Sequence, residues 1–480
     1  MLKKLLSLML TLCILLSLSA CGNTPTPSVG GVAEQTTPTQ LPTTNPTEGT
    51  PSAGATTPQT TEPTVLPTNP TPQPEVETVP PATEPTPTQP EATEPAPSLP
   101  PTLEPDPAPT YGHTPLPASE YYHYSQMSAT EKQIYAVLVS AIKNLQGEVS
   151  LRSYDIKADA ALKLFQRVLA DNPQLFWVSR SSSVVYDSRT QKVDTFILQF
   201  TDGEKVDGVS SHNKPIVLAD RNKIAAKRQT LEDKIAQILS TIPANISQVE
   251  REKRIHDYIL ANVRYDYATA ANATVVNGFL PHPFDIYGAA IEGISVCEGY
   301  AKLFQYLCYR TGISATQMIG TANGGDHMWN CVQLDGAWYE IDVTWADTDS
   351  GIPYYGYFNL THQQMSQSHT PDSSRIPYPQ AEGTKYRFAD YYALKLLSAT
   401  QVSDTYKQVI DRLIAAGSGY LIVYKNGVTL TGADINTLVY SPRAAIQQYV
   451  KARGYRLELQ NSYSTFEDFV YISCTVKSLA

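Results

Sequence analysis

The chain has 480 residues, with 46 acidic and 36 basic side chains, 36 prolines and six cysteines. Its length suits two to four domains of about 100–200 residues each, and its cysteines are too few for a small disulfide scaffold. The formal net charge of −10 is uneven, because residues 1–21 contribute +2 while residues 22–120 carry eleven carboxylates and no Lys or Arg. The remainder carries about −1 (−10 − 2 + 11), which argues against a nucleic-acid binder steered by a basic surface.

Residues 1–20 have the pattern of a signal peptide, with two lysines before the apolar run Leu5–Leu18 and small residues after it. The run is shorter than the about 20 apolar residues that a membrane-spanning helix needs. The next residue, Cys21, follows Leu-Ser-Ala and resembles the lipidated cysteine of the bacterial lipoprotein lipobox. The resemblance implies export and a lipid anchor at the outer face of the bacterial cell membrane. An ordinary signal peptide followed by a chance cysteine is the alternative.

Residues 21–118 form a spacer, in which Gly22–Pro117 holds 26 of the 36 prolines among Thr, Glu, Ala and Gln. Such a segment has few apolar side chains to bury, and proline donates no backbone hydrogen bond. We expect it to be disordered with polyproline II character and to act as a stalk between the membrane and the folded part. Drift of unconstrained sequence is the alternative explanation of its composition.

Residues 119–240 are predicted to form an α+β domain of unknown role. Apolar side chains at helical spacing predict four helices here and just beyond, and alternation around a polar turn predicts one hairpin. The helices lie near Tyr135–Ile142, Ala161–Leu169, Leu218–Ile242 and Gln248–Val263, and the hairpin spans Ser183–Phe200.

A cysteine lies at the start of a predicted helix in the central segment, residues 241–385. Ser295 and Glu298 have the spacing of a capping box, which assigns both to the helix cap and places Cys297 in the first turn. Gly312 suits the position just after the helix. The positive end of the helix dipole favours thiolate over thiol, and free N–H groups there can stabilise an oxyanion. Cys297 is therefore a candidate nucleophile.

A hairpin follows this helix, with the two-residue turn Asp335-Gly336 between two alternating runs. With this turn, Trp329 stands opposite Asp342, and His327 lies diagonally from Asp342 on the same face of the sheet. Side chains in that relation are about 7–8 Å apart at the backbone and within reach of each other, whereas a slip of one residue would separate them. The register therefore predicts a His327–Asp342 pair, which needs only Cys297 packed against it to complete a nucleophile, base and carboxylate.

Three motifs together resemble the transglutaminase-like superfamily in its bacterial branch: Ser295–Ala301, Asp326–Asn330 and Tyr339–Trp345. The resemblance covers about residues 245–365, with the motifs in the expected order and spacing. It implies an α+β, papain-like core, in which the helix with the cysteine packs on an antiparallel sheet. By the match of motifs, Cys297 is the nucleophile, His327 the general base and acid, and Asp342 the orienting carboxylate.

The reaction implied by the resemblance is acyl transfer at an amide bond through a thioester, resolved by water (in a peptidase or deamidase) or by an amine (in cross-linking). We expect a protein or peptide substrate, such as a cell-wall peptide, and no cofactor, resident metal or nucleic acid. Trp329 and Tyr287 are the candidate substrate-binding side chains; for Tyr287 the alternative is a loop aromatic packed under the helix. Other hypotheses are a catalytically idle surface module that binds peptide or glycan, and a stalk protein whose terminal domains mediate adhesion.

Several further side chains have structural interpretations. Cys308 is expected in the core, Cys331 as a buried thiol and His256 as a partly exposed helix residue. A zinc site and a calcium site remain as alternatives, the former from Cys297, Cys331, His327 and Asp342, the latter from Asp347 and Asp349.

Residues 386–480 are predicted to form a small α/β domain on whose function the sequence is silent. Its expected elements are helices near Val402–Ala416 and Pro442–Arg453 and strands near Tyr420–Tyr424, Tyr455–Leu459 and Phe469–Val476.

Overall fold

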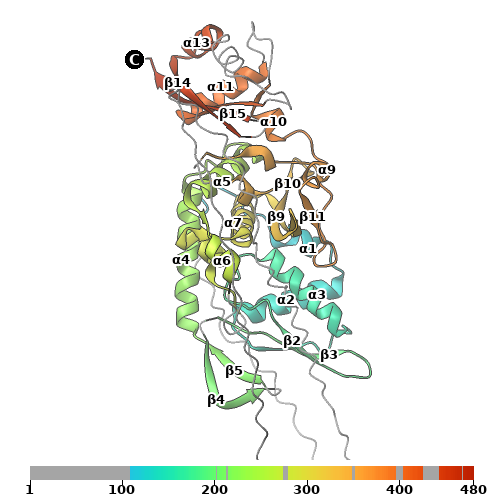
Figure 1. Cartoon of the computed structure of the whole chain (residues 1–480). Coiled ribbons are helices and arrows are strands. Elements are labelled where there is room, and N and C mark those ends of the chain that lie inside the picture. Colours follow the sequence, from blue (N-terminus) through green and yellow to red (C-terminus); the bar gives the residue numbers. More distant parts are fainter. Residues whose placement is uncertain are drawn as a thin grey trace, which may run out of the picture. The chain divides into compact units, whose positions relative to one another are not determined.

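The computed structural model of the protein (Figure 1) describes residues 109–201, 203–211, 214–273, 279–348, 352–395, 404–424, 443–466 and 469–479. The predicted signal peptide, Cys21 and the spacer as far as residue 108 lie outside these ranges. Within them, no helix combines the length and the apolar character that a membrane crossing requires.

The first part of the described chain combines helices with two small antiparallel sheets. Its elements are η1 (Ala118–Glu120), α1 (Tyr122–Ser125), α2 (Ala129–Lys143), β1 (Glu148–Ser150), α3 (Ala158–Asp171), β2 (Ser183–Tyr186), β3 (Val193–Ile197), β4 (Gly203–Ser211) and β5 (Lys214–Ala219). One sheet has the strand order β1-β3-β2 and the other pairs β4 with β5. The predicted hairpin is confirmed as β2 and β3, and the predicted apolar stripes lie on the buried faces of α2 and α3.

The central part is built on a four-stranded antiparallel sheet of order β10-β9-β8-β11, on which helix α7 packs. Its elements are α4 (Arg221–Ser240), α5 (Gln248–Asn262), β6 (Arg264–Tyr265), α6 (Tyr267–Asn272), η2 (His282–Phe284), η3 (Gly288–Glu292), β7 (Ile294–Ser295), α7 (Cys297–Arg310), β8 (Ser314–Ala322), β9 (Gly325–Leu334), β10 (Ala337–Ile341), α8 (Val343–Ala346), η4 (Tyr355–Tyr357), α9 (His362–Met365), β11 (His369–Pro371) and α10 (Phe388–Tyr391). The predicted α+β class, with a helix on an antiparallel sheet, is confirmed.

The turn between β9 and β10 sets the register of the sheet. Asp335 and Gly336 both have positive φ, of 50° and 83°, as a two-residue turn of type I′ requires. The cross-strand partners from Leu334 with Ala337 as far as Asn330 with Ile341 are those that this turn implies, whereas the predicted pair of Trp329 with Asp342 lies beyond the end of the ladder. This register decides which side chains of β9 and β10 share a face.

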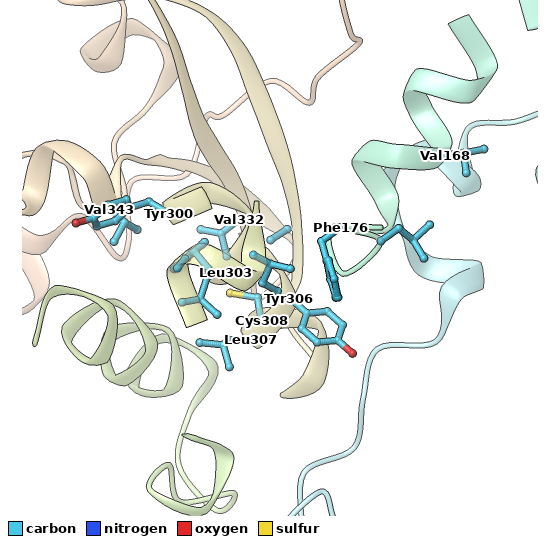
Figure 2. Packing of buried hydrophobic residues seen from close by; sticks show 14 of the residues in the cluster. Val168, Phe176, Tyr300, Leu303, Tyr306, Leu307, Cys308, Val332 and Val343 are labelled. Atoms are coloured by element: carbon cyan, nitrogen blue, oxygen red, sulfur yellow. The ribbon is translucent and has the colours of Figure 1, made fainter. Parts of the chain in front are cut away.

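Helix α7 is held by the core along almost its whole length, since all of its residues except Lys302 and Arg310 are buried. Figure 2 shows Leu303, Leu307 and Cys308 of α7 in the same packed cluster as Val332 of β9. Burial of a large apolar side chain is worth about 1.5–3 kcal/mol. The position of the residue that begins this helix is therefore fixed by the whole core.

The same hydrophobic cluster extends from Met127 to Tyr471. The segments before and after the predicted boundary at residues 240 and 241 thus contribute to one continuous core, and that boundary stays a prediction.

The last part of the described chain is a sheet of order β12-β13-β15-β14 with two helices. Its elements are β12 (Leu394–Lys395), α11 (Asp404–Ala416), β13 (Ser418–Tyr424), α13 (Arg443–Lys451), β14 (Tyr455–Phe466) and β15 (Phe469–Ser478). The predicted helices and strands are confirmed here, although β14 continues seven residues beyond its predicted end at Leu459, past a register shift.

Candidate active site

Cys297 begins α7, as predicted, but the start of the helix is built differently from the prediction. Val296 precedes the first turn and provides no side-chain cap, while Ser295 Oγ donates to the carbonyl oxygen of Pro283 at 2.9 Å. The predicted capping box is therefore wrong. Ser295 belongs to the short strand β7, which pairs with β6, so its backbone is extended and its hydroxyl points to the preceding segment.

Glu298, which was expected to complete that cap, forms two ion pairs instead. Its Oε1 lies 2.6 Å from Arg180 Nη2 and 2.6 Å from Lys302 Nζ. Burial alone would raise the pKa of Glu298, but the two cations outweigh it and lower the pKa. The first turn of α7 is thus anchored by a cation from the loop before β2, which is remote in sequence.

An imidazole and a carboxylate meet near the start of β9 and just past the end of β10. His327 Nε2 lies 2.7 Å from Asp342 Oδ2, and both side chains are buried. The other oxygen of Asp342, Oδ1, accepts from the backbone N–H of Thr344 at 2.9 Å and of Trp345 at 3.1 Å. The predicted His327–Asp342 pair is therefore confirmed. The ladder itself stops at Ile341, and Asp342 is the cap of α8 rather than a strand residue opposite Trp329.

The charge of Asp342 is secured by its neighbours. Burial alone would raise the pKa of Asp342, but His327 and His369 outweigh it and hold the pKa well below its ordinary value. A carboxylate that accepts from Nε2 keeps the imidazole proton on that nitrogen and leaves Nδ1 as the acceptor. His327 is therefore oriented as a base whose acceptor nitrogen is Nδ1.

The start of α7 is tied to the strand that carries His327. Cys297 packs with Ala301 and Met328 in a small buried cluster, so the cysteine lies beside the residue that follows His327. Asn330 Nδ2, also on β9, donates to the carbonyl oxygen of Ala301 at 3.1 Å. A helix start therefore places a thiol against the strand whose imidazole contacts a carboxylate, and nucleophilic catalysis by cysteine requires these three groups.

A second histidine, His369, shares the carboxylate. Its Nε2 lies 3.0 Å from Asp342 Oδ2 and its Nδ1 lies 2.8 Å from Ser368 Oγ. The sequence analysis missed His369, because the residue lies in none of the motifs. Only the pairing of β11 with β8, which sets His369 opposite Ala322, brings it to the site. Near His369, the sequence carries no signal of this role beyond the residue type, histidine.

Comparison with known proteins agrees with this geometry. The sequence profile described as the Transglutaminase-like superfamily matches residues 235–343, a range that includes Cys297, His327 and Asp342.

The chain carries a transglutaminase-like superfamily domain.

Relatives of the transglutaminase-like domain include two kyphoscoliosis peptidases. The chain is 26% identical over 210 residues to the one from Mus musculus and 28% identical over 180 residues to the one from Homo sapiens. The matches cover 38% and 32% of this chain, and it spans only 31% and 26% of the lengths of these curated relatives. A solved structure described as a TGase is 13% identical, with 40% of this chain and 49% of that chain covered and a TM-score of 0.22.

Two tryptophans of the transglutaminase-like domain flank the imidazole of His327. Trp329 stacks on it with ring centroids 6.0 Å apart, is 1% exposed and donates from Nε1 to Glu340 Oε2 at 2.7 Å. Trp345 lies 5.6 Å away on a tilted plane, and its buried Nε1 has no hydrogen-bond partner within the described chain. Trp329 thus has almost no surface to offer a substrate and supports the imidazole from behind, whereas Trp345 has an unused donor beside it.

Tyr287, the other candidate for substrate binding, packs between neighbours of its own. Its ring lies 5.1 Å from that of Phe176 and 5.0 Å from that of His282, and Lys227 Nζ is 5.8 Å from its centroid. These contacts are those of a packed loop aromatic; the alternative stated above, packing under the helix, stays a prediction.

The remaining sulfurs are buried, as expected. Burial raises the pKa of the Cys308 and Cys331 thiols well above the ordinary value, which makes both inert compared with a thiol at a helix start. The expectation for His256 was wrong: the side chain is 0% exposed, because it lies on the inner face of α5 against Tyr355 and Phe358.

One cluster of the described residues has the composition of a metal site. Donor atoms of His327, Asp342 and His369 all lie within 4.8 Å of one another. Cys331 of the alternative zinc set points elsewhere, with Sγ 3.6 Å from Met318 Sδ. Of the alternative calcium ligands, Asp347 accepts from the Tyr300 hydroxyl, and Asp349 lies outside the described residues.

Proposed function

We propose that this protein is an exported, lipid-anchored cysteine enzyme that transfers the acyl group of a protein or peptide amide through a thioester. The observation that carries the proposal is the 2.7 Å contact between His327 Nε2 and buried Asp342 Oδ2, on the strand against which Cys297 packs. The superfamily match supports the same chemistry, because it spans all three residues.

In the first half of the proposed reaction, Nδ1 of His327 takes the proton of the Cys297 thiol. The thiolate attacks the carbonyl carbon of the amide, and the negative charge that develops on the oxygen is stabilised by N–H groups at the start of α7. Asp342 stays ionised and stabilises the imidazolium.

The tetrahedral intermediate then collapses. The carbon–nitrogen bond breaks, the amine leaves with the proton from His327, and the acyl group remains on Cys297 as a thioester. Water or a second amine, deprotonated by His327, attacks the thioester and releases the thiolate. The name of the kyphoscoliosis peptidases favours water as the acceptor in this chain.

The test of catalysis is mass spectrometry of a peptide library after incubation with the full chain. Shortened peptides report hydrolysis, conversion of side-chain amides to acids reports deamidation, and coupled peptides that have lost ammonia report cross-linking. Cys297→Ala should abolish every such change, whereas the matched control Cys308→Ala removes a buried thiol of the same helix and should keep them. Equal product from Cys297→Ala and wild type would overturn the proposal.

The proposed anchor rests on Cys21 and is tested separately. Expressed in a bacterium fed a radiolabelled fatty acid, the wild-type protein should be labelled and sediment with membranes. Cys21→Ser should lose the label, while Cys297→Ala should keep it. An unlabelled wild-type protein would contradict the lipoprotein assignment and leave the proposed chemistry untouched.

A further inference from the structure

Two imidazole nitrogens converge on one carboxylate oxygen in the candidate active site. Nε2 of His327 and Nε2 of His369 lie 2.7 Å and 3.0 Å from Oδ2 of Asp342. All three side chains are buried, with exposed fractions of 7%, 1% and 0% for the residues His327, His369 and Asp342. The proposed acyl transfer uses His327 and Asp342, but it leaves no role for a second histidine on the same oxygen.

We propose that these residues, the His–Asp–His cluster, form an inhibitory site for a zinc ion. The ion is a reversible ligand in this proposal and takes no part in turnover. Binding of zinc follows from the cluster alone, whereas its inhibitory effect rests on the proposed function of His327.

The donor set is that of a zinc site. Two imidazoles and one carboxylate are ligands of catalytic zinc, and their bonds to the metal are about 2.0–2.2 Å long. Tetrahedral bonds of that length place neighbouring donor atoms about 3.3 Å apart, so each Nε2 needs to move away from Oδ2 by only about 0.3–0.6 Å. Imidazole nitrogen also selects against magnesium and calcium, which prefer oxygen ligands.

Residues around the cluster suit it to metal binding. Oδ1 of Asp342 is occupied by the N–H groups of Thr344 and Trp345, which leaves Oδ2 as a single, oriented donor. Nδ1 of His369 lies 2.8 Å from Ser368 Oγ, and a hydroxyl either donates to a bare nitrogen or accepts from N–H. Ser368 therefore fits both the metal-free state, with the proton on Nε2, and the metal-bound state, with the proton on Nδ1.

Aromatic rings close the surroundings of His369. Its ring centroid lies 4.6 Å from that of Trp345, 4.9 Å from that of Trp329 and 5.5 Å from that of Tyr357. Such packing holds the imidazole in one orientation and favours a compact, partly dehydrated ion. Water or the Cys297 thiolate would supply the fourth ligand.

Zinc in this position would stop the proposed reaction, because it changes which nitrogen of His327 carries the proton. When Nε2 of His327 is bonded to zinc, it carries no proton. In a neutral His327 the proton moves from Nε2 to Nδ1, and no proton is released. A His327 imidazolium, which has a proton on both nitrogens, releases one proton when it binds zinc. Nδ1–H cannot accept the proton of Cys297. The carboxylate that orients the base would at the same time be engaged with the metal.

The test uses the full chain with Cys297→Ala, which cannot catalyse, so that zinc binding is measured independently of the proposed function. Equilibrium dialysis against Zn²⁺ and absorption spectra with Co²⁺ should show one tetrahedral site. Adding His369→Gln should weaken binding at this site by at least about 100-fold. The matched control is His362→Gln, since His362 Nδ1 forms a similar contact of 2.7 Å with Glu340 Oε1. This variant should bind zinc as tightly as the Cys297→Ala chain.

A second measurement tests the zinc site in case the His369→Gln variant fails to fold. Zn²⁺ should raise the melting temperature of the Cys297→Ala chain. Adding Asp342→Asn, which keeps the contacts of Oδ1 and replaces Oδ2, should remove that rise, whereas adding His362→Gln should keep it. Equal affinity of the His369→Gln and His362→Gln variants for zinc, or an equal rise in melting temperature with Asp342→Asn, would overturn the zinc site. Zinc binding that leaves wild-type turnover unchanged would overturn its inhibitory role.

Discussion

Replacing Asp342 by Asn exchanges one oxygen for an N–H₂ group at the centre of the candidate site. Because Oδ1 accepts from the N–H groups of Thr344 and Trp345, the Asn side chain has to keep its oxygen there. Its Nδ2 then takes the place of Oδ2 and faces Nε2 of His327. An amide N–H donates and does not accept, so His327 has to move its proton to Nδ1, where it can no longer receive the proton of Cys297.

The size of the effect follows from the contacts that are lost. A hydrogen bond to a charged group contributes about 1.5–3 kcal/mol, so the loss of the one that stabilises the imidazolium disfavours the thiolate–imidazolium pair by about 10- to 150-fold. The wrong tautomer adds to this loss, and the same substitution in a serine protease triad lowers kcat by about 10⁴-fold. We therefore expect alkylation of Cys297 near pH 6 to slow by about 100-fold or more.

The assay is the rate of iodoacetamide labelling of Cys297, measured by mass spectrometry on the native protein from about pH 5 to 10. The two rates should converge at high pH, where a thiol ionises without a base. Asp347→Asn is the control, since it removes a carboxylate that accepts from Tyr300 and should label like wild type. Equal rates for Asp342→Asn and wild type across the whole pH range, with both proteins folded, would refute the reasoning.

Three further predictions concern stability and the surroundings of the thiol. Burial raises the pKa of Glu252 to about 8, so the folded chain keeps a proton that the unfolded chain releases. Stability in urea unfolding should therefore fall between about pH 4.5 and 8, and Glu252 contributes up to about 1.4 kcal/mol per pH unit to that fall. Glu252→Gln should reduce the slope without removing it, since burial also raises the pKa of Asp171 to about 7, and Glu250→Gln should not reduce it. Trp329→Phe removes a donor of a buried 2.7 Å hydrogen bond and should cost about 1–3 kcal/mol in the same assay. Trp345→Phe, the matched control, loses no hydrogen bond within the described chain and should leave the unfolding midpoint unchanged. Gly299→Ala would set a Cβ 2.8 Å from two backbone carbonyl oxygens, and should cost about 1–3 kcal/mol and slow iodoacetamide labelling by shifting the first turn of α7. An unchanged unfolding midpoint in Trp329→Phe or Gly299→Ala, or a lower midpoint in Trp345→Phe, would contradict these assignments.

The features that sequence predicted correctly are those that depend on neighbouring residues. The turn Asp335-Gly336 fixes a hairpin register over the adjacent strands, because two positive φ angles in succession select one turn type. That register alone predicted the contact of His327 with Asp342. The same locality explains why the helices and strands of the last part of the chain, apart from the end of β14, were found within a few residues of their ends.

The features that sequence missed depend on contacts between distant segments. Ser295 and Glu298 have the spacing of a capping box, yet the hydroxyl of Ser295 donates to the carbonyl oxygen of Pro283 and the carboxylate of Glu298 pairs with Arg180. His369 joins the site through an antiparallel pairing with β8 that no pattern near His369 indicates.

By itself, the sequence determined the helix that begins at Cys297, the hairpin and the pairing of one histidine with one aspartate, since turn chemistry and strand alternation act over a few residues. Only the tertiary structure decided the second histidine on Asp342, the burial of Trp329 behind the imidazole and the cation that holds Glu298. These arise where separate segments meet in one core, and the free energy of that packing depends on shape and burial that short-range patterns do not encode.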